Sequence, residues 1–165
     1  MQSSLGLFAQ WLSDTALSQL IQNTSWVIPG VQCIHILSIA LVMSSAVMLL
    51  LRVLGVVMRD LPTAEVAQRF LPWIWYPLIV LLLSGAILIV GAPGRSLTIS
   101  VFQLKMVLLL AAIACTLTLQ HPLRTDAMFW ESTAGARAAG KLIAVTSLGL
   151  WSAIIFAGRW IAYAG

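Results

Sequence analysis

Three basic side chains stand inside otherwise apolar stretches and are the residues whose types could do chemistry. They are His35 in VQCIHILSIAL, Lys105 in VFQLKMVLLL and Arg159 in FAGRWIAY. An ionisable group inside a bilayer is costly unless it pairs, reaches the surface or faces a cavity. No Asp or Glu lies in these stretches. The three residues are therefore candidates for a site that binds an anion or a cofactor.

The elements that must position them are membrane-spanning helices. Of the 165 residues, 61% are hydrophobic and only 8% are charged, whereas soluble domains carry about 25% charged residues. Spanning a bilayer needs roughly 20 mainly apolar residues. Four stretches meet this condition, at about 28–57, 71–91, 98–119 and 141–163. The sequence thus predicts an all-α fold, a four-helix transmembrane bundle.

The N-terminal segment, residues 1–27, has a different pattern. Phe8, Trp11, Leu12 and Leu20 recur at roughly helical spacing, with Gln and Ser between them. This pattern predicts an amphipathic interfacial helix. It lacks the basic start of a signal peptide, so we expect no cleavage. Residues 28–165 then form the transmembrane domain.

The loops indicate the orientation in the membrane. Basic residues concentrate in the loops after the first and third stretches and their flanks: Arg52, Arg59, Arg69, Arg124, Arg137 and Lys141. The opposite face has Arg95 as its one basic loop residue. The positive-inside rule predicts cytoplasmic basic loops and two periplasmic termini in a bacterial inner membrane. The net charge of +4 fits such loops better than nucleic-acid binding.

In an up-and-down bundle His35, Lys105 and Arg159 share one membrane face, on the order of 10 Å below the interface. Together they would need an anion, water or carbonyl oxygens. The three residues also have two interpretations that involve no ligand. Lys105 and Arg159 could extend to lipid headgroups, and His35 could be a neutral ring bonded to a serine or a carbonyl.

The first apolar stretch also predicts where His35 points. A stripe of small and polar residues follows helical spacing and differs from the Leu-, Ile- and Met-rich faces around it. Small and hydroxyl residues favour helix contacts in membranes. We therefore expect this stripe to face the bundle or a partner subunit; it consists of His35, Ser38, Val42, Ser45, Leu49 and Arg52.

Haem b is the sharpest cofactor hypothesis. His35 would be the axial ligand of the iron, and Lys105 and Arg159 would pair with the propionates. His121 lies at the far end of its helix, so a second axial His is absent from the membrane stretches. The iron would be five-coordinate, or take Met106, or be shared by two copies of His35 in a homodimer.

The alternative is a non-enzymatic membrane component. Its basic pocket would hold a lipid or other anion, or it would dock another membrane subunit. Copper is weaker, because Cys33 and His35 are two residues apart and point in different directions on a helix. No GxSxG, P-loop, HExxH or carboxylate pair occurs within a span. The sequence therefore offers no catalytic residue.

Several motifs together resemble a family of short bacterial four-helix membrane proteins of unknown function. They are HILSIAL, LLLRVLG, FLPWIWYPLIVLLLSGAIL, VFQLKM and SLGLWSAIIFAGRWIAY. The resemblance covers nearly the whole chain and carries His35, Arg52, Ser84-Gly85, Lys105 and Gly158-Arg159.

This chain departs from that family at one point. Many relatives have Asp-Leu-Arg where this chain has Leu50-Leu51-Arg52. The resemblance thus implies that a carboxylate partner of Arg52 is missing. A more distant similarity, to CopD-like copper-resistance membrane proteins and to haem-associated HemJ-type protoporphyrinogen oxidases, favours haem.

Overall fold

The computed structural model describes residues 4–94, 100–123 and 126–160. Arg95, Arg124 and the last residues, 161–165, lie outside the described residues. The described elements are all helices: α1 (Ser4–Ser13), α2 (Ala16–Asn23), α3 (Val27–Val53), α4 (Thr63–Phe70), α5 (Pro72–Gly91), α7 (Ser100–Leu123), α8 (Phe129–Ser132) and α9 (Ala134–Trp160).

The predicted fold class is confirmed. Four helical segments are long and apolar enough to cross a membrane, namely α3, the joined α4 and α5, α7, and α9. No strand occurs in the described ranges. Large apolar side chains such as Leu37, Leu110 and Phe156 are exposed along these helices. Such a surface suits a lipid environment and not water.

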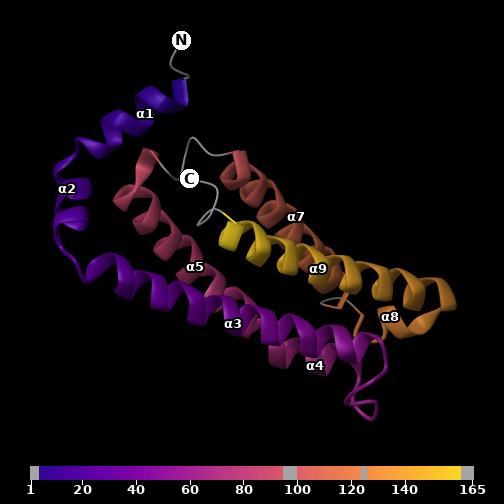
Figure 1. Ribbon diagram of the computed structural model, residues 1–165. Helices are drawn as coiled ribbons and strands as arrows, with labels where there is room; N and C mark the ends of the chain where they lie inside the picture. Colours follow the sequence, from indigo (N-terminus) through magenta and orange to yellow (C-terminus); the bar gives the residue numbers. More distant parts are fainter. Residues whose placement is uncertain (1–3, 95–99, 124–125, 161–165) are drawn as a thin grey trace.

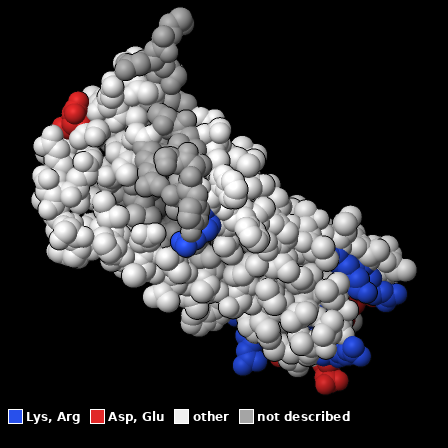
Figure 2. All heavy atoms as spheres, viewed as in Figure 1, with Lys and Arg blue, Asp and Glu red and all other residues white. Residues whose placement is uncertain are grey.

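The four spanning segments pack as two antiparallel pairs (Figure 1). α3 lies along α5, α7 lies along α9, and contact between α3 and α9 joins the pairs. α1, α2 and the described end of α9 lie at one end of the bundle, which we call the α1 end. The start of α4 and α8 lie at the other, the α8 end. Charged side chains gather at the α8 end (Figure 2).

The predicted stripe of α3 faces the bundle. Ser38, Val42, Ser45, Leu49 and Arg52 are buried and His35 is half-buried. The core around them contains buried apolar side chains from all four spanning segments, including Ile74, Leu78, Ala112, Leu119, Trp151 and Ile154. The stripe therefore holds α3 between its two neighbouring helices, α5 and α9.

Two local features set the geometry of the first pair. α3 ends because Gly55, the residue after the C-cap Leu54, adopts a positive φ of 75°, a left-handed conformation that glycine favours at this position. In α5, Pro77 has no N–H and leaves the carbonyl of Trp73 without its usual helical partner. The hydroxyl of Ser45 donates to that carbonyl at 3.5 Å. A polar residue of the stripe thus supports an interrupted neighbouring helix.

The N-terminal segment forms two helices where the sequence pattern suggested one. Thr15 caps α2 by accepting from the backbone N–H of Ser18 at 3.3 Å. The Ser18 hydroxyl then donates to the carbonyl of Val90 at 2.7 Å, and Ile21 packs against Gly91. α2 is therefore fastened to the end of α5, while apolar side chains on both helices, including Phe8, Trp11, Leu17 and Leu20, remain exposed.

Two further differences matter at the α8 end. α9 begins at Ala134, seven residues before the predicted start at 141, and the Thr133 hydroxyl caps it by accepting from Ala136 N–H at 3.1 Å. The short helices α4 and α8 were not predicted from the sequence. Both helices contribute residues to a polar network around Arg52.

Candidate functional site

His35 is held at the interface between α3 and α5. Its ring nitrogen Nδ1 lies 2.8 Å from the hydroxyl oxygen of Ser84 on α5. The neighbouring Gly85 lies beside the ring, and a Cβ there would be 3.7 Å from His35 Cε1, which is an ordinary van der Waals contact. The Ser-Gly pair therefore gives the ring a hydrogen-bond partner and a surface to pack on. We call His35, Ser84, Lys105 and Gly158 the α1-end site.

The hydrogen bonds of Ser84 assign the tautomer of His35. The Ser84 hydroxyl also lies 2.6 Å from the carbonyl oxygen of Val80, and a carbonyl can only accept. A hydroxyl has one hydrogen, so both contacts are hydrogen bonds only if His35 Nδ1 carries a proton and donates to Ser84. In the neutral ring, Nε2 then keeps its lone pair. It has no polar partner among the described residues.

Lys105 lies close enough to His35 for the two groups to interact electrostatically. It is half-buried on α7, and its Nζ would lie 3.4 Å from a Cβ at Gly158 on α9. The ammonium group thus lies beside α9, at a distance that an added methyl group would meet as ordinary contact. Within the described ranges Lys105 forms no hydrogen bond or ion pair. Residues of four helices therefore place an imidazole lone pair and an ammonium group within electrostatic range of each other.

The other predicted site residues are not joined to this pair. Arg159 is exposed in the last described turn of α9, and Met106 is half-buried on α7. The polar and electrostatic interactions of His35 within the described chain are those with Ser84 and Lys105, so Met106 is not in polar contact with the ring. His121 is exposed near the end of α7 at the opposite end of the bundle.

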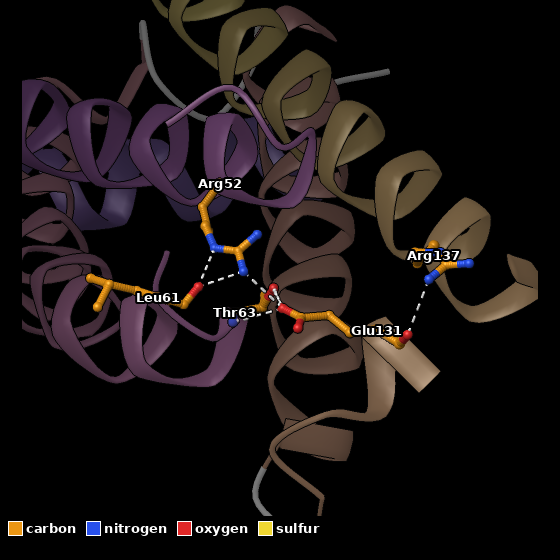
Figure 3. A network of polar contacts seen from close by, with 5 residues as sticks. All are labelled: Arg52, Leu61, Thr63, Glu131 and Arg137. Carbon is orange, nitrogen blue, oxygen red and sulfur yellow. Dashed lines mark hydrogen bonds and ion pairs between the residues drawn. The ribbon is translucent and has the colours of Figure 1, made fainter. Parts of the chain in front are cut away.

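A second polar cluster, which sequence analysis missed, lies at the α8 end (Figure 3). We call Arg52, Leu61, Thr63 and Glu131 the α8-end network. Arg52 on α3 donates through Nε to the Leu61 carbonyl at 2.8 Å and through a terminal nitrogen to Glu131 Oε1 at 2.9 Å. The same carboxylate oxygen accepts from the backbone N–H of Thr63 at 2.9 Å and from its hydroxyl.

This network corrects the expectation that Arg52 lacks a carboxylate partner. The partner comes from α8, 79 positions along the chain, and not from the helix that carries the arginine. Hydrogen bonds from Thr63, with the charge of Arg52, lower the pKa of Glu131, although partial burial opposes this. Glu131 thus stays ionised at neutral pH and joins α3, α4 and α8.

The donor set limits the metals that the α1-end site could hold. No group of three or more His, Cys, Asp or Glu that could bind a metal ion occurs in the described part of the chain. A bare metal ion prefers several such ligands. Haem iron, by contrast, takes four nitrogens from its macrocycle and needs one axial imidazole from the protein. His35, with Nδ1 occupied and Nε2 free, fits that requirement.

These observations define a helical protein with four segments long and apolar enough to span a membrane, and with a histidine–lysine site to which each segment contributes one residue. The chain belongs to DUF6644, a family of unknown function, whose model matches residues 8–164. This agrees with the resemblance drawn from the motifs. The comparison with protein families does not show the distant similarity to CopD-like and HemJ-type proteins. No curated protein and no solved structure matches the chain.

Proposed function

We propose that this protein binds haem b at the α1-end site. The single observation that carries the proposal is the hydrogen bond from His35 Nδ1 to Ser84. Histidines that bind metals usually donate their other ring N–H to a nearby acceptor, which fixes the tautomer and the ring orientation. Ser84 does this for His35 and leaves Nε2 for the iron. Bound haem would supply a one-electron redox centre.

Lys105 supplies the charge that haem requires. A propionate in a low-dielectric region needs a positive partner, and Lys105 has no competing carboxylate among the described residues. Arg159, one residue beyond Gly158, would pair with the second propionate nearer the surface. His35 thus orients the iron and the two basic residues hold the carboxylates. A second copy of the chain would supply a second His35 if the iron is six-coordinate.

The test is an absorption spectrum of the protein purified in mild detergent from haem-replete cells. We expect a Soret band near 400 nm and sharpened α and β bands after dithionite reduction. His35→Ala should lose them, and His121→Ala, the matched control at the opposite end, should keep them. A colourless wild-type protein would overturn the proposal, and so would an unchanged spectrum of His35→Ala.

A second candidate function rests on Lys105. An ammonium group without a carboxylate partner attracts any anion, so the α1-end site could hold a lipid phosphate in place of haem. The two candidates depend on different residues. Phosphate binding should fail in Lys105→Met and persist in His35→Ala, because the imidazole has no charge to contribute. Co-purified lipid, measured by mass spectrometry in both variants, separates these outcomes.

We also propose the bacterial inner membrane as the location, with the α1 end in the periplasm. Four exposed basic residues at or near the α8 end support this under the positive-inside rule: Arg59, Arg69, Arg137 and Lys141. Fusions of a fluorescent protein and of alkaline phosphatase to the C-terminus test it. Phosphatase activity without fluorescence is expected, and the reverse result would contradict the orientation.

A further inference from the structure

A cavity of about 540 Å³ lies between the α4–α5 segment and α7, on the side of the bundle away from the α3–α9 contact. Its inner wall is apolar and includes the buried Ala67 and Leu71. Its outer rim includes Gln68 and Tyr76, both exposed. The cavity lies where two candidate membrane spans, α5 and α7, have their ends at the α8 end of the bundle. Its volume is in the range of small-molecule sites.

One hydrogen bond fixes the polar end of this cavity. The indole N–H of Trp75 on α5 donates to Gln120 Oε1 on α7 at 3.0 Å. That bond uses the acceptor of the Gln120 side chain and leaves its NH₂ group as a donor. Among the described residues, neither this NH₂ group nor the side chain of Gln68 forms a hydrogen bond. The cavity therefore presents the NH₂ group of Gln120 as an oriented donor that has no acceptor among the described residues.

The position and charge of these donors indicate the class of ligand. Gln120 lies three residues before the end of α7, which is about 4.5 Å along the axis. The donors thus lie near the membrane interface, where the polar head of an amphiphile resides. No Lys or Arg lines the cavity. A phosphate buried here would lack a charged partner, whereas a neutral carbonyl needs only hydrogen-bond donors.

The aromatic residues add a second requirement. Trp75 and Tyr76 line the cavity beside the amide groups. Aromatic side chains favour flat, conjugated partners in offset or edge-on contact. A flat ring that carries neutral carbonyls and an apolar tail combines all of these properties. A phospholipid has the apolar tail but not the flat ring, and its phosphate is charged.

We propose that this cavity binds the head ring of an isoprenoid quinone. Gln120 donates to one ring carbonyl, Trp75 both orients Gln120 and contacts the ring, and the isoprenoid tail extends from the cavity into the lipid. This site lies at the α8 half of the bundle and does not depend on what binds at the α1-end site.

The experiment uses the full chain in nanodiscs of neutral phosphatidylcholine and titrates decylubiquinone. We expect saturable quenching of tryptophan fluorescence and a rise in the thermal midpoint, because a ligand that binds the folded state stabilises it. Gln120→Leu should weaken binding about tenfold, which is the cost of a lost hydrogen bond in an apolar site. Gln103→Leu, an exposed residue at the other end of α7, is the matched control and should bind like wild type.

A second variant and a competition experiment complete the test of the quinone site. Trp75→Phe removes the indole N–H and should weaken binding even if Gln120→Leu unfolds the protein. Competition with phosphatidylglycerol and with diacylglycerol tests other occupants of the same cavity. Equal quenching and equal midpoint shifts in wild type, Gln120→Leu and Trp75→Phe would overturn the proposal. Displacement of the quinone by equimolar phospholipid or diacylglycerol would overturn it as well.

Discussion

The two ends of the bundle treat a basic residue in opposite ways. At the α8 end, Arg52 donates to a carbonyl and a carboxylate, and Glu131 accepts from two residues. At the α1 end, Lys105 has no hydrogen bond or ion pair within the described chain, and His35 Nε2 has no polar partner there. The first cluster is complete without a ligand and the second is not. Whether the polar groups of a cluster are already satisfied within the protein therefore separates a structural role from a binding role better than the types of residue do.

The connecting segments explain the difference. Arg52 lies in the last turn of α3, where the following loop and α8 can deliver a carbonyl and a carboxylate. Lys105 and His35 lie further inside apolar helices, where neighbouring side chains are almost all hydrocarbon. A network that holds the loops should therefore govern stability, and the α1-end site should govern binding. Four substitutions test this contrast.

Arg52→Ala should have the largest effect on stability. It leaves the Leu61 carbonyl and the Glu131 carboxylate without their charged partner, and removal of one partner from a buried ion pair costs about 3–5 kcal/mol. Because Glu131 is partly exposed, we expect the loss of unfolding free energy to lie near the lower end of this range. Detergent-based unfolding measures it. Arg59→Ala, at an exposed position in the loop that follows α3, should lose little. Equal losses would show that the network does not matter.

Glu131→Gln should cost about 1–2 kcal/mol at neutral pH, because charge-assisted hydrogen bonds become neutral ones. The lowered pKa of Glu131 also fixes the direction in which stability changes with pH. Its stabilising contribution is complete above the ordinary carboxylate range and is lost as pH falls through the lowered pKa. Wild type should thus lose stability in acid more steeply than the variant. Glu65→Gln, at an exposed site on α4, should keep the wild-type slope.

Ser84→Ala should cost about 1 kcal/mol, because it leaves the His35 N–H without an acceptor. It should also lower haem affinity by about tenfold or more, as loss of an outer partner of a metal ligand does. Thr116→Ala is the control, because the Thr116 hydroxyl also donates to a carbonyl of its own helix, that of Ala112, but bonds to no other helix within the described residues. If both variants bind haem equally, Ser84 does not orient His35.

Lys105→Met should change stability least, within about 0.5 kcal/mol of wild type or slightly above it. The variant removes a half-buried charge that has no carboxylate partner in the described chain, so little favourable energy is lost. Haem or anion binding should fall in the same variant. A loss of stability as large as that of Arg52→Ala would mean that Lys105 is paired, and the contrast between the two ends would fail.

Much of the fold follows from periodicity and composition alone. Apolar runs predicted the first three spans to within about four residues and missed the first seven residues of the fourth, while helical spacing predicted the stripe of α3 with His35 and Arg52 on it. The same spacing could not identify Glu131 as a partner, because Glu131 lies on α8, which follows two further spanning segments. Arg52 and Glu131 do lie on the same predicted membrane face, and this shared face was the one feature of the sequence that could have suggested their pairing. The contact between Lys105 and Gly158 depends on helix packing that no local pattern encodes.

The pairing of Arg52 with Glu131 also sets an order of events during synthesis. The arginine leaves the ribosome 79 residues before its carboxylate. At roughly 5–20 residues per second, this interval lasts roughly 4–16 s, during which the third span must be made. Until then the first hairpin stands in the membrane with an unmatched charge at its end. Because Glu131 precedes α9 in the chain, the network can close before the second helix pair is complete, and the fourth span then packs against a first pair whose loop is already fixed.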